Sequence, residues 1–441
     1  MFYKNLLSKT LLLCSLILFS YVFYRSEIFW SGENRSYYFK YYIFISLLFF
    51  TSIVNFFLSK KLKTYFIIIL MTSLVSAVLA DLYLSYFGNH GIYFKKQKIK
   101  IFEENSNRKF DQRNTVSIYS DLVKQNKNIT VKVSPKQFLK KGNLNFYPLA
   151  GISKKDTIYS NENGYYLIYK SDRFGFNNPD NEWNKKETEY LLIGDSFAHG
   201  CCVKNNENIG HNLRKLSNKS VINLGYSANG PLLELGSLKE YYPNKVNNIV
   251  WLYFENDLDD LNDELQNEFL KKYLLDKNFL QNLTQKQDEI DLYLSKSLND
   301  KFESRKLVNK ENKKLYFFID TLKLYKLRHF FSSLISEKRP LNFKIFEEII
   351  VEAKFFARKK NANLIFVYLP DYSTYKIKKT SQNYEKIKNL IKKNQIKFVD
   401  MHKEFSKNEN PLVFFPFGFY GHYNAKGYEK VAQKIFSITN N

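Results

Sequence analysis

The sequence predicts a three-layer α/β/α domain with a parallel sheet, preceded by three transmembrane helices. From residue 190 onward, short apolar runs alternate with longer helical stretches, which is typical of parallel βαβ units. The first 90 residues hold three long apolar runs, which are typical of membrane spans. We therefore expect a membrane region over 1–90, a linker over 91–137 and a globular domain over 138–441.

The three apolar runs lie near residues 8–24, 41–58 and 65–87. The first is short for a hydrocarbon core about 30 Å thick and is also compatible with a signal peptide. It ends in the residues VFYR, without a small-residue cleavage site, so we interpret it as a retained span. Asp81 lies toward the end of the third run and is expected to reach the lipid headgroups; a buried functional acid is the other interpretation.

Within the domain, five apolar runs are predicted to form strands and five amphipathic stretches to form helices. The strands are expected at 190–193, 220–224, 248–254, 363–369 and 396–400, and the helices at 207–217, 231–241, 343–359, 382–393 and 425–438. A charged helical insertion over 261–340 interrupts the pattern. It is predicted to form either a cap over the functional site or a solvated side lobe.

The first strand leads into the stretch YLLIGDSFAHG, which places Ser196 just beyond the strand end. The carboxyl end of a parallel strand borders the ligand crevice of such a sheet. Backbone N–H groups at the start of a following helix are suited to meet an anion there. Asp195 directly precedes the serine and is expected to brace the turn.

Three further motifs follow in order. A glycine, Gly225, follows the second strand in VINLGYSANG, and Asn256 follows the third strand in WLYFENDLDD. His422 stands before the last helix in PFGFYGHYNAKGYEKVA. With the GDS turn at Ser196, these motifs resemble the blocks of the SGNH/GDSL hydrolases, although the glycine that usually precedes the asparagine is replaced by Glu255.

The resemblance implies a flavodoxin-like SGNH domain that acts as a serine esterase or acyl-transferase. A serine hydroxyl becomes a nucleophile when a base such as the His422 imidazole accepts its proton. The implied oxyanion hole comprises the Ser196 N–H, the Gly225 N–H and the Asn256 amide. Fixed donors of this kind lower the barrier, and the loss of one costs on the order of 10²- to 10³-fold in rate.

Members of the family usually carry an aspartate two or three residues before the histidine, where this chain has Phe419 and Tyr420. The site is therefore expected to be either a Ser–His dyad or one in which another group orients the ring. The candidates are Asp371, Asp400 and a backbone carbonyl. Two further histidines are expected outside the reacting groups, His199 in a structural role and His402 on a solvated helix.

Composition restricts the remaining classes of function. The net charge of +24 comes from lysines spread along the chain, and no nucleic-acid motif accompanies it. We interpret this positive charge as a bias in residue usage together with a solvated surface; the alternative is that it attracts anionic lipid or acidic polysaccharide. Adjacent cysteines rarely pair, so Cys201 and Cys202 predict no disulfide framework. No Cys/His spacing predicts a zinc site, and neither a metal nor a cofactor is expected.

The sequence therefore predicts a membrane-anchored enzyme that acts on acylated carbohydrate or lipid of the cell envelope. The resemblance favours a multi-pass protein of the bacterial inner membrane with its catalytic domain in the periplasm. Hydrolysis and acyl transfer share an acyl-enzyme, and the sequence does not separate them. The alternative is a non-catalytic SGNH-fold module that binds glycan or a partner protein. A basic nucleic-acid binder rests on net charge alone.

Overall fold

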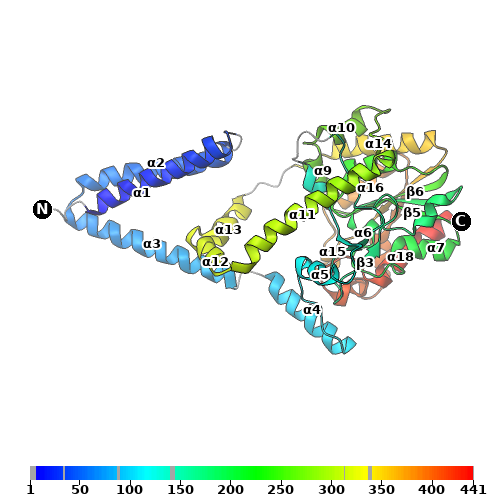
Figure 1. Cartoon of the computed structure of the whole chain (residues 1–441), viewed down its shortest axis with the longest axis horizontal. Helices are drawn as coiled ribbons and strands as arrows, with labels where there is room; N and C mark the ends of the chain where they lie inside the picture. Colours follow the sequence, from blue (N-terminus) through cyan, green and yellow to red (C-terminus); the bar gives the residue numbers. More distant parts are fainter. Residues whose placement is uncertain are drawn as a thin grey trace. The chain divides into compact units, whose positions relative to one another are not determined.

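The computed structural model describes residues 6–32, 35–86, 90–139, 145–311, 313–335 and 340–440. They form two compact units (Figure 1). The membrane unit comprises Met1–Asn89 and Lys314–Ile335, and the sheet unit comprises His90–Lys313 and Ser336–Asn441. The predicted end of the third apolar run at Phe87 and residues 336–339 of the predicted insertion lie outside the described residues.

Three helical stretches at the start of the chain are long and apolar enough to cross a membrane, namely Ser8–Phe29, Arg35–Phe57 and Lys60–Tyr86. The elements that form them are α1 (Leu6–Phe23) with the π-helical η2 (Tyr24–Phe29), α2 (Arg35–Phe57) and α3 (Lys60–Tyr86). A buried hydrogen bond joins α1 to α2, from Ser8 Oγ to Asn55 Oδ1 at 2.8 Å. This confirms the three apolar helices expected from the sequence.

The membrane unit also contains α12 (Lys313–Leu322) and α13 (Tyr325–Ile335) from the predicted insertion. Asp81 of α3 is buried, and its Oδ1 accepts a hydrogen bond of 2.9 Å from the Leu327 N–H of α13. The carboxylate therefore binds the backbone at the start of another helix, and the depth of Asp81 in a membrane stays a prediction. An anion is favourable at that end of a helix.

The sheet unit is built on five parallel strands, and all five match the predicted runs. They are β4 (Thr188–Gly194), β5 (Val221–Asn223), β6 (Val246–Tyr253), β7 (Asn363–Tyr368) and β8 (Lys397–Asp400). Their order, β5-β4-β6-β7-β8, is that of a flavodoxin-like sheet. In such a sheet the crevice opens at the carboxyl ends of the first and third strands along the chain, here β4 and β6.

Helices cover both faces of the sheet, as the three-layer prediction requires. Alternate residues of a strand point to opposite faces, so Trp251 and Val250 of β6 enter different cores. One core takes side chains from α7 (Ile209–Ser217) and α18 (Ala425–Thr439), and the other from α8 (Pro231–Glu240), α14 (Phe343–Lys359) and α16 (Tyr384–Lys393). These five helices are the five that the sequence predicts.

The first part of the insertion belongs to the core beside α8 and α14. Its elements are α9 (Asp257–Glu264), α10 (Glu268–Leu275), η5 (Leu283–Gln285) and α11 (Gln287–Glu311). Leu270, Leu283 and Leu294 are fully buried there. The insertion is therefore divided between the two units, an arrangement that neither a cap over the site nor a solvated side lobe describes.

The predicted linker is also structured. Together with the segment that precedes β4, it forms α4 (His90–Ser106), α5 (Thr115–Leu122), β1 (Ile129–Val131), η3 (Pro135–Phe138), β2 (Asp156–Ile158), β3 (Ile168–Lys170) and η4 (Asp180–Asn184). Strand β2 pairs in parallel with β1 and antiparallel with β3. The loop between β2 and β3 matters for the site described below. The remaining short helices are α6 (Ser196–His199), α15 (Tyr372–Lys376), α17 (Met401–Phe405), η6 (Pro411–Phe414) and η7 (Pro416–Gly418).

Candidate active site

Ser196 stands at the carboxyl end of β4, on a turn that only glycine accommodates. Gly194 has a φ of +149°, and a Cβ there would lie 2.6 Å from the carbonyl oxygen of Leu252. After the turn, Asp195 caps α6 by accepting a hydrogen bond of 2.8 Å from the Phe197 N–H. The Ser196 side chain is left partly exposed as the first residue of α6.

His422 lies in the loop before α18, directly ahead of two anchored residues. The Tyr423 ring is fully buried, and its hydroxyl donates a hydrogen bond of 2.7 Å to the Pro370 carbonyl. Asn424 caps α18 by accepting from the Gly427 N–H at 3.1 Å. The ring of Phe197 lies 4.7 Å from the imidazole, centre to centre, and holds it beside the serine.

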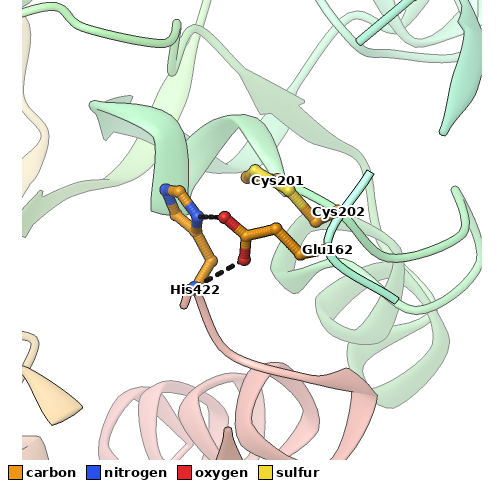
Figure 2. Close-up of side chains that lie close together, drawn as sticks. All are labelled: Glu162, Cys201, Cys202 and His422. Carbon is orange, nitrogen blue, oxygen red and sulfur yellow. Dashed lines mark hydrogen bonds and ion pairs between the residues drawn. A yellow bond between two sulfur atoms is a disulfide. The ribbon is translucent and has the colours of Figure 1, made fainter. Parts of the chain in front are cut away.

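The Ser196 hydroxyl, the His422 ring and a carboxylate form one hydrogen-bonded chain. The distance from Ser196 Oγ to His422 Nε2 is 2.8 Å, and from His422 Nδ1 to Glu162 Oε1 it is 3.0 Å. The other carboxylate oxygen, Glu162 Oε2, accepts from the backbone N–H of His422 at 2.8 Å. Figure 2 shows the carboxylate facing both N–H groups of the histidine. This is the geometry of a nucleophile, a base and an orienting acid.

Glu162 comes from the loop between β2 and β3, ahead of the whole central sheet. Asn161 ties that loop down by donating from Nδ2 to the Asp111 carbonyl at 2.7 Å. Burial raises the pKa of Glu162, but the charge and hydrogen bonds of His422 and the charge of Lys98 outweigh this effect. The pKa of Glu162 therefore lies below its ordinary value, and the group is a carboxylate at neutral pH.

The acids expected from the sequence occupy other places. Asp371 caps α15, where its Oδ2 accepts from the N–H and the hydroxyl of Ser373. Asp400 caps α17 and accepts a hydrogen bond of 2.5 Å from the Tyr384 hydroxyl. The prediction that Asp371, Asp400 or a backbone carbonyl orients the ring is therefore wrong, because the Glu162 carboxylate takes that position.

Asp195 provides a second acceptor beside the serine. Its Oδ2 lies 3.1 Å from Ser196 Oγ, slightly farther than His422 Nε2. Burial raises the pKa of Asp195 to about 6. The hydrogen bond from the Phe197 N–H and the charge of His422 lower this pKa, but burial outweighs them. With Glu162 accepting the Nδ1 proton, Nε2 is left without a proton and can accept the one on the serine.

The three predicted oxyanion donors differ in whether their N–H groups already donate to another acceptor. The Gly225 N–H donates to Asn223 Oδ1 at 2.9 Å. A Cβ on Gly225 would lie 2.3 Å from the Cβ of Ala198, so the glycine lets β5 approach the nucleophile turn. Asn256 Nδ2 donates one hydrogen to Asp260 Oδ2 at 2.8 Å, which leaves its second hydrogen available. The Ser196 N–H opens α6 and has no acceptor within that helix.

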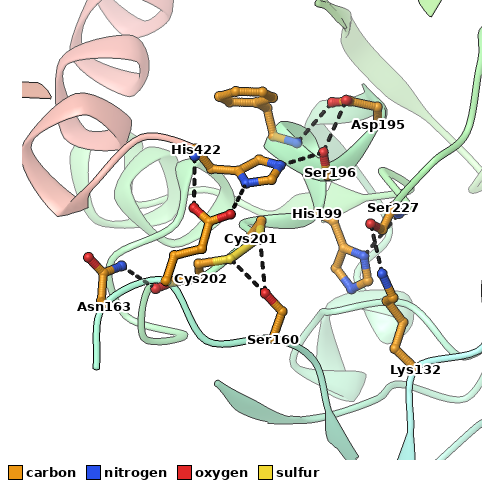
Figure 3. Close-up of a disulfide and its surroundings, with 12 residues drawn as sticks. Lys132, Ser160, Asn163, Asp195, Ser196, His199, Cys201, Cys202, Ser227 and His422 are labelled. Carbon is orange, nitrogen blue, oxygen red and sulfur yellow. Dashed lines mark hydrogen bonds and ion pairs between the residues drawn. A yellow bond between two sulfur atoms is a disulfide. The ribbon is translucent and has the colours of Figure 1, made fainter. Parts of the chain in front are cut away.

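His199 is buried behind the serine and supports the neighbouring loop, as Figure 3 shows. Its Nδ1 accepts from the Ser227 N–H at 3.2 Å, and Lys132 Nζ donates to Ser227 Oγ at 2.9 Å. Burial lowers the pKa of His199 well below its ordinary value, so the ring stays neutral. The other histidine expected outside the reacting groups is His402. It was predicted to be solvated, but it is partly buried, and its Nδ1 contacts the Tyr375 hydroxyl.

Cys201 and Cys202 are joined by a disulfide just after α6. The expectation that two adjacent cysteines stay unpaired is therefore wrong in this structure. Both side chains are buried, and the Ser160 hydroxyl lies 3.1 Å from Cys202 Sγ. The third cysteine, Cys14, is exposed on α1 and unpaired.

No family model matches the chain, and no curated protein matches it. Among solved structures, the chain is similar to two lipolytic proteins of the G-D-S-L family. The one from Desulfitobacterium hafniense DCB-2 is 11% identical, with 58% of this chain and 99% of that chain covered and a TM-score of 0.31. The one from Veillonella parvula DSM 2008 is 13% identical, with the same coverage of both chains and a TM-score of 0.31.

Proposed function

We propose that this protein is a membrane-anchored serine esterase or acyl-transferase in which Ser196, His422 and Glu162 form the catalytic triad. The observation that carries the proposal is the hydrogen-bonded chain from Ser196 Oγ through the imidazole to Glu162, with distances of 2.8 and 3.0 Å. A serine without such a base is a poor nucleophile.

In the proposed reaction, His422 Nε2 accepts the proton of Ser196 as Oγ attacks the ester carbonyl. Glu162 holds the ring with its remaining proton on Nδ1 and stabilises the imidazolium that forms. The imidazolium then gives its proton to the leaving alcohol, and an acyl-enzyme remains. Water or a second hydroxyl group resolves it, which distinguishes a hydrolase from a transferase.

The developing oxyanion is met by the Ser196 N–H and the free hydrogen of the Asn256 amide. Both come from the carboxyl ends of neighbouring strands, β4 and β6, where a flavodoxin-like sheet has its crevice. Gly225 contributes close packing in this proposal, since its N–H is already bound to Asn223. A substrate-induced change of the Asn223 rotamer would release that N–H as a third donor.

The proposed substrate is an acylated carbohydrate or lipid of the cell envelope, reached from the periplasmic side of a bacterial inner membrane. Three apolar helices supply the anchor. A cavity of about 680 Å³ borders Glu162, with Tyr166, Tyr372 and Tyr420 in its wall and Lys95 at its rim. Tyrosine rings beside a basic group suit a polar, anionic substrate such as an acidic sugar or a phosphate-bearing headgroup.

A non-catalytic module that binds glycan or a partner protein is the second candidate. It is favoured by the internal bond of the Gly225 N–H, which removes one expected oxyanion donor. Such a module has no need for a serine within hydrogen-bonding distance of a base that a carboxylate orients. Reactivity of Ser196 therefore separates the two candidates.

The test is labelling of the detergent-solubilised full chain with a fluorophosphonate, whose phosphorus the serine oxygen attacks as fluoride leaves. Wild-type protein is expected to be labelled on Ser196, and Ser196→Ala is expected to remain unlabelled. The matched control is Ser227→Ala, which removes a buried serine of the adjoining loop. An unlabelled wild type, or equal labelling of Ser196→Ala, would refute the enzymatic proposal.

A further inference from the structure

The disulfide between Cys201 and Cys202 lies directly against the orienting end of the triad. Cys201, Cys202, Glu162 and His422 each offer one ligand atom, and these atoms all lie within 4.8 Å of one another. Figure 2 shows the sulfurs beside the Glu162 carboxylate, and Figure 3 places Ser196 on the other side of the imidazole. The acid and the sulfurs therefore share one side of the His422 ring.

The backbone of this region is held from two directions. The Tyr428 hydroxyl of α18 donates to the Cys201 carbonyl at 3.1 Å, and Asn163 Nδ2 donates to the Cys202 carbonyl at 2.5 Å. Asn163 neighbours Glu162 in the β2–β3 loop, so the cysteine pair and the acid are fixed to each other. Breaking the sulfur–sulfur bond leaves these main-chain contacts intact.

Two thiolates, an imidazole nitrogen and a carboxylate oxygen are ligands that Zn²⁺ takes in a tetrahedral site. Ligand distances of about 2.0 to 2.3 Å require ligand atoms roughly 3.3 to 3.8 Å apart in that geometry. His422 Nδ1 and Glu162 Oε1 are 3.0 Å apart, so a small separation of these atoms is sufficient. The sulfurs must separate as well, which reduction of their bond permits.

We propose that reduction of the Cys201–Cys202 disulfide creates an inhibitory site for Zn²⁺ formed by the two thiolates, His422 Nδ1 and Glu162. The inference rests on the proposed function for its inhibitory consequence. A dithiol supplies the two electrons: the sulfur–sulfur bond breaks, two protons reach the cysteine sulfurs, and the dithiol closes to its own disulfide. Metal binding then releases the thiol protons, because thiolates are the ligands.

The inhibition follows from which ring nitrogen faces the cluster. Nδ1 faces Glu162 and the sulfurs, whereas Nε2 faces Ser196 Oγ at 2.8 Å. A neutral imidazole that binds a metal through Nδ1 carries its one proton on Nε2. That proton points at the serine, so the ring cannot accept the proton of Ser196. The same metal would also bind the Glu162 carboxylate, which then no longer orients the ring.

The experiment uses the full chain in detergent with Cys14→Ser as background, which removes the one other thiol. Protein reduced with dithiothreitol and desalted without oxygen is titrated with Co²⁺, whose thiolate bonds absorb light. One equivalent of Co²⁺ is expected to bind with a thiolate-to-cobalt band, and Zn²⁺ is expected to displace it. Two controls are expected to give no band. One is the same protein without reduction, in which the disulfide is intact, and the other is the reduced Cys201→Ser/Cys202→Ser variant.

Fluorophosphonate labelling provides the second readout. One equivalent of Zn²⁺ is expected to slow the labelling of reduced protein at least tenfold, with recovery on addition of a chelator, and to leave unreduced protein unaffected. Absence of the band from reduced protein overturns the site, and a band with unchanged labelling overturns its inhibitory role. If unreduced, metal-free protein is not labelled at all, the proposed function fails, while the cobalt band still reports on the site.

Discussion

Glu162→Gln tests whether the carboxylate of the β2–β3 loop orients His422 in the proposed triad. The carboxylate accepts two N–H groups of His422, one from the ring at 3.0 Å and one from the backbone at 2.8 Å. Glutamine has nearly the same shape but only one acceptor oxygen. If that oxygen keeps the backbone bond, the amide NH₂ faces Nδ1, and the ring must carry its proton on Nε2. The base is then blocked by its own proton.

The magnitude follows from the known cost of that wrong tautomer. In a serine protease, replacing the orienting aspartate by asparagine lowers kcat by about 10⁴-fold. At about 1.36 kcal/mol for each factor of ten, this corresponds to roughly 5.5 kcal/mol of lost transition-state stabilisation. Partial exposure of Glu162 and His422 to solvent, 23% and 24% of their side chains, allows water to support the ring. We therefore expect a loss between about 10³- and 10⁴-fold.

The assay is the second-order rate of fluorophosphonate labelling, supported by hydrolysis of a chromogenic acetyl ester. The matched controls are Asp371→Asn and Asp400→Asn, which remove carboxylates of the same sheet edge that cap helices α15 and α17. Because asparagine caps a helix about as well as aspartate, each control is expected to cost less than about 1 kcal/mol of stability and less than threefold in rate. A Glu162→Gln protein that keeps more than a tenth of the wild-type rate, or a control that falls as far, would refute the assignment.

Three further predictions address the oxyanion donor, a buried acid and the membrane unit. Asn256→Ala is expected to lower kcat by about 10²- to 10³-fold with little change in KM in ester hydrolysis; an unchanged kcat would exclude the amide as a donor. Burial raises the pKa of Glu264 to about 8. The stability linked to that proton is therefore lost as pH rises from the unfolded pKa of about 4.3 to the folded pKa of about 8, by up to about 1.4 kcal/mol per unit, and little more is lost above that. The wild-type unfolding midpoint relative to that of Glu264→Gln is expected to fall from pH 5 to pH 8, and a pH-independent difference would contradict this. Asp81→Ala removes the acceptor of the Leu327 N–H, so proteolysis within α12 and α13 is expected to accelerate several-fold relative to wild type, and an unchanged cleavage pattern would argue against that contact.

The central sheet could be predicted because each strand carries its own signal. Runs such as 190–193 and 248–254 are apolar on both faces, as strands buried between two helical layers must be. Helices α7 and α18 begin at asparagine caps, Asn208 and Asn424, which mark their starts in the sequence. Ser196 and His422 stood out for the same reason, since each lies next to an element boundary that local residues define.

Glu162 could not be predicted because nothing local distinguishes it. It is one acid in the loop 159–167 between two three-residue strands, and 260 positions separate it from the histidine that it contacts. The acids expected from the sequence, Asp371 and Asp400, lie at or just after the carboxyl ends of strands of the central sheet. The hairpin of β2 and β3 supplies the orienting acid instead, from the preceding segment.

The origin of the acid in this hairpin couples the proposed triad to parts of the chain outside the sheet. Ser196 and His422 are fixed by β4 and α18, whereas the third member belongs to a loop from which Asn161 and Asn163 each donate one hydrogen bond to neighbouring main chain. The Asn163 bond ends on the Cys202 carbonyl, so the cysteine pair and the loop that carries the acid are tied to each other through the main chain. A displacement of that loop would release the imidazole and leave the nucleophile turn unchanged. The base, rather than the serine, is therefore the point at which this site is open to control.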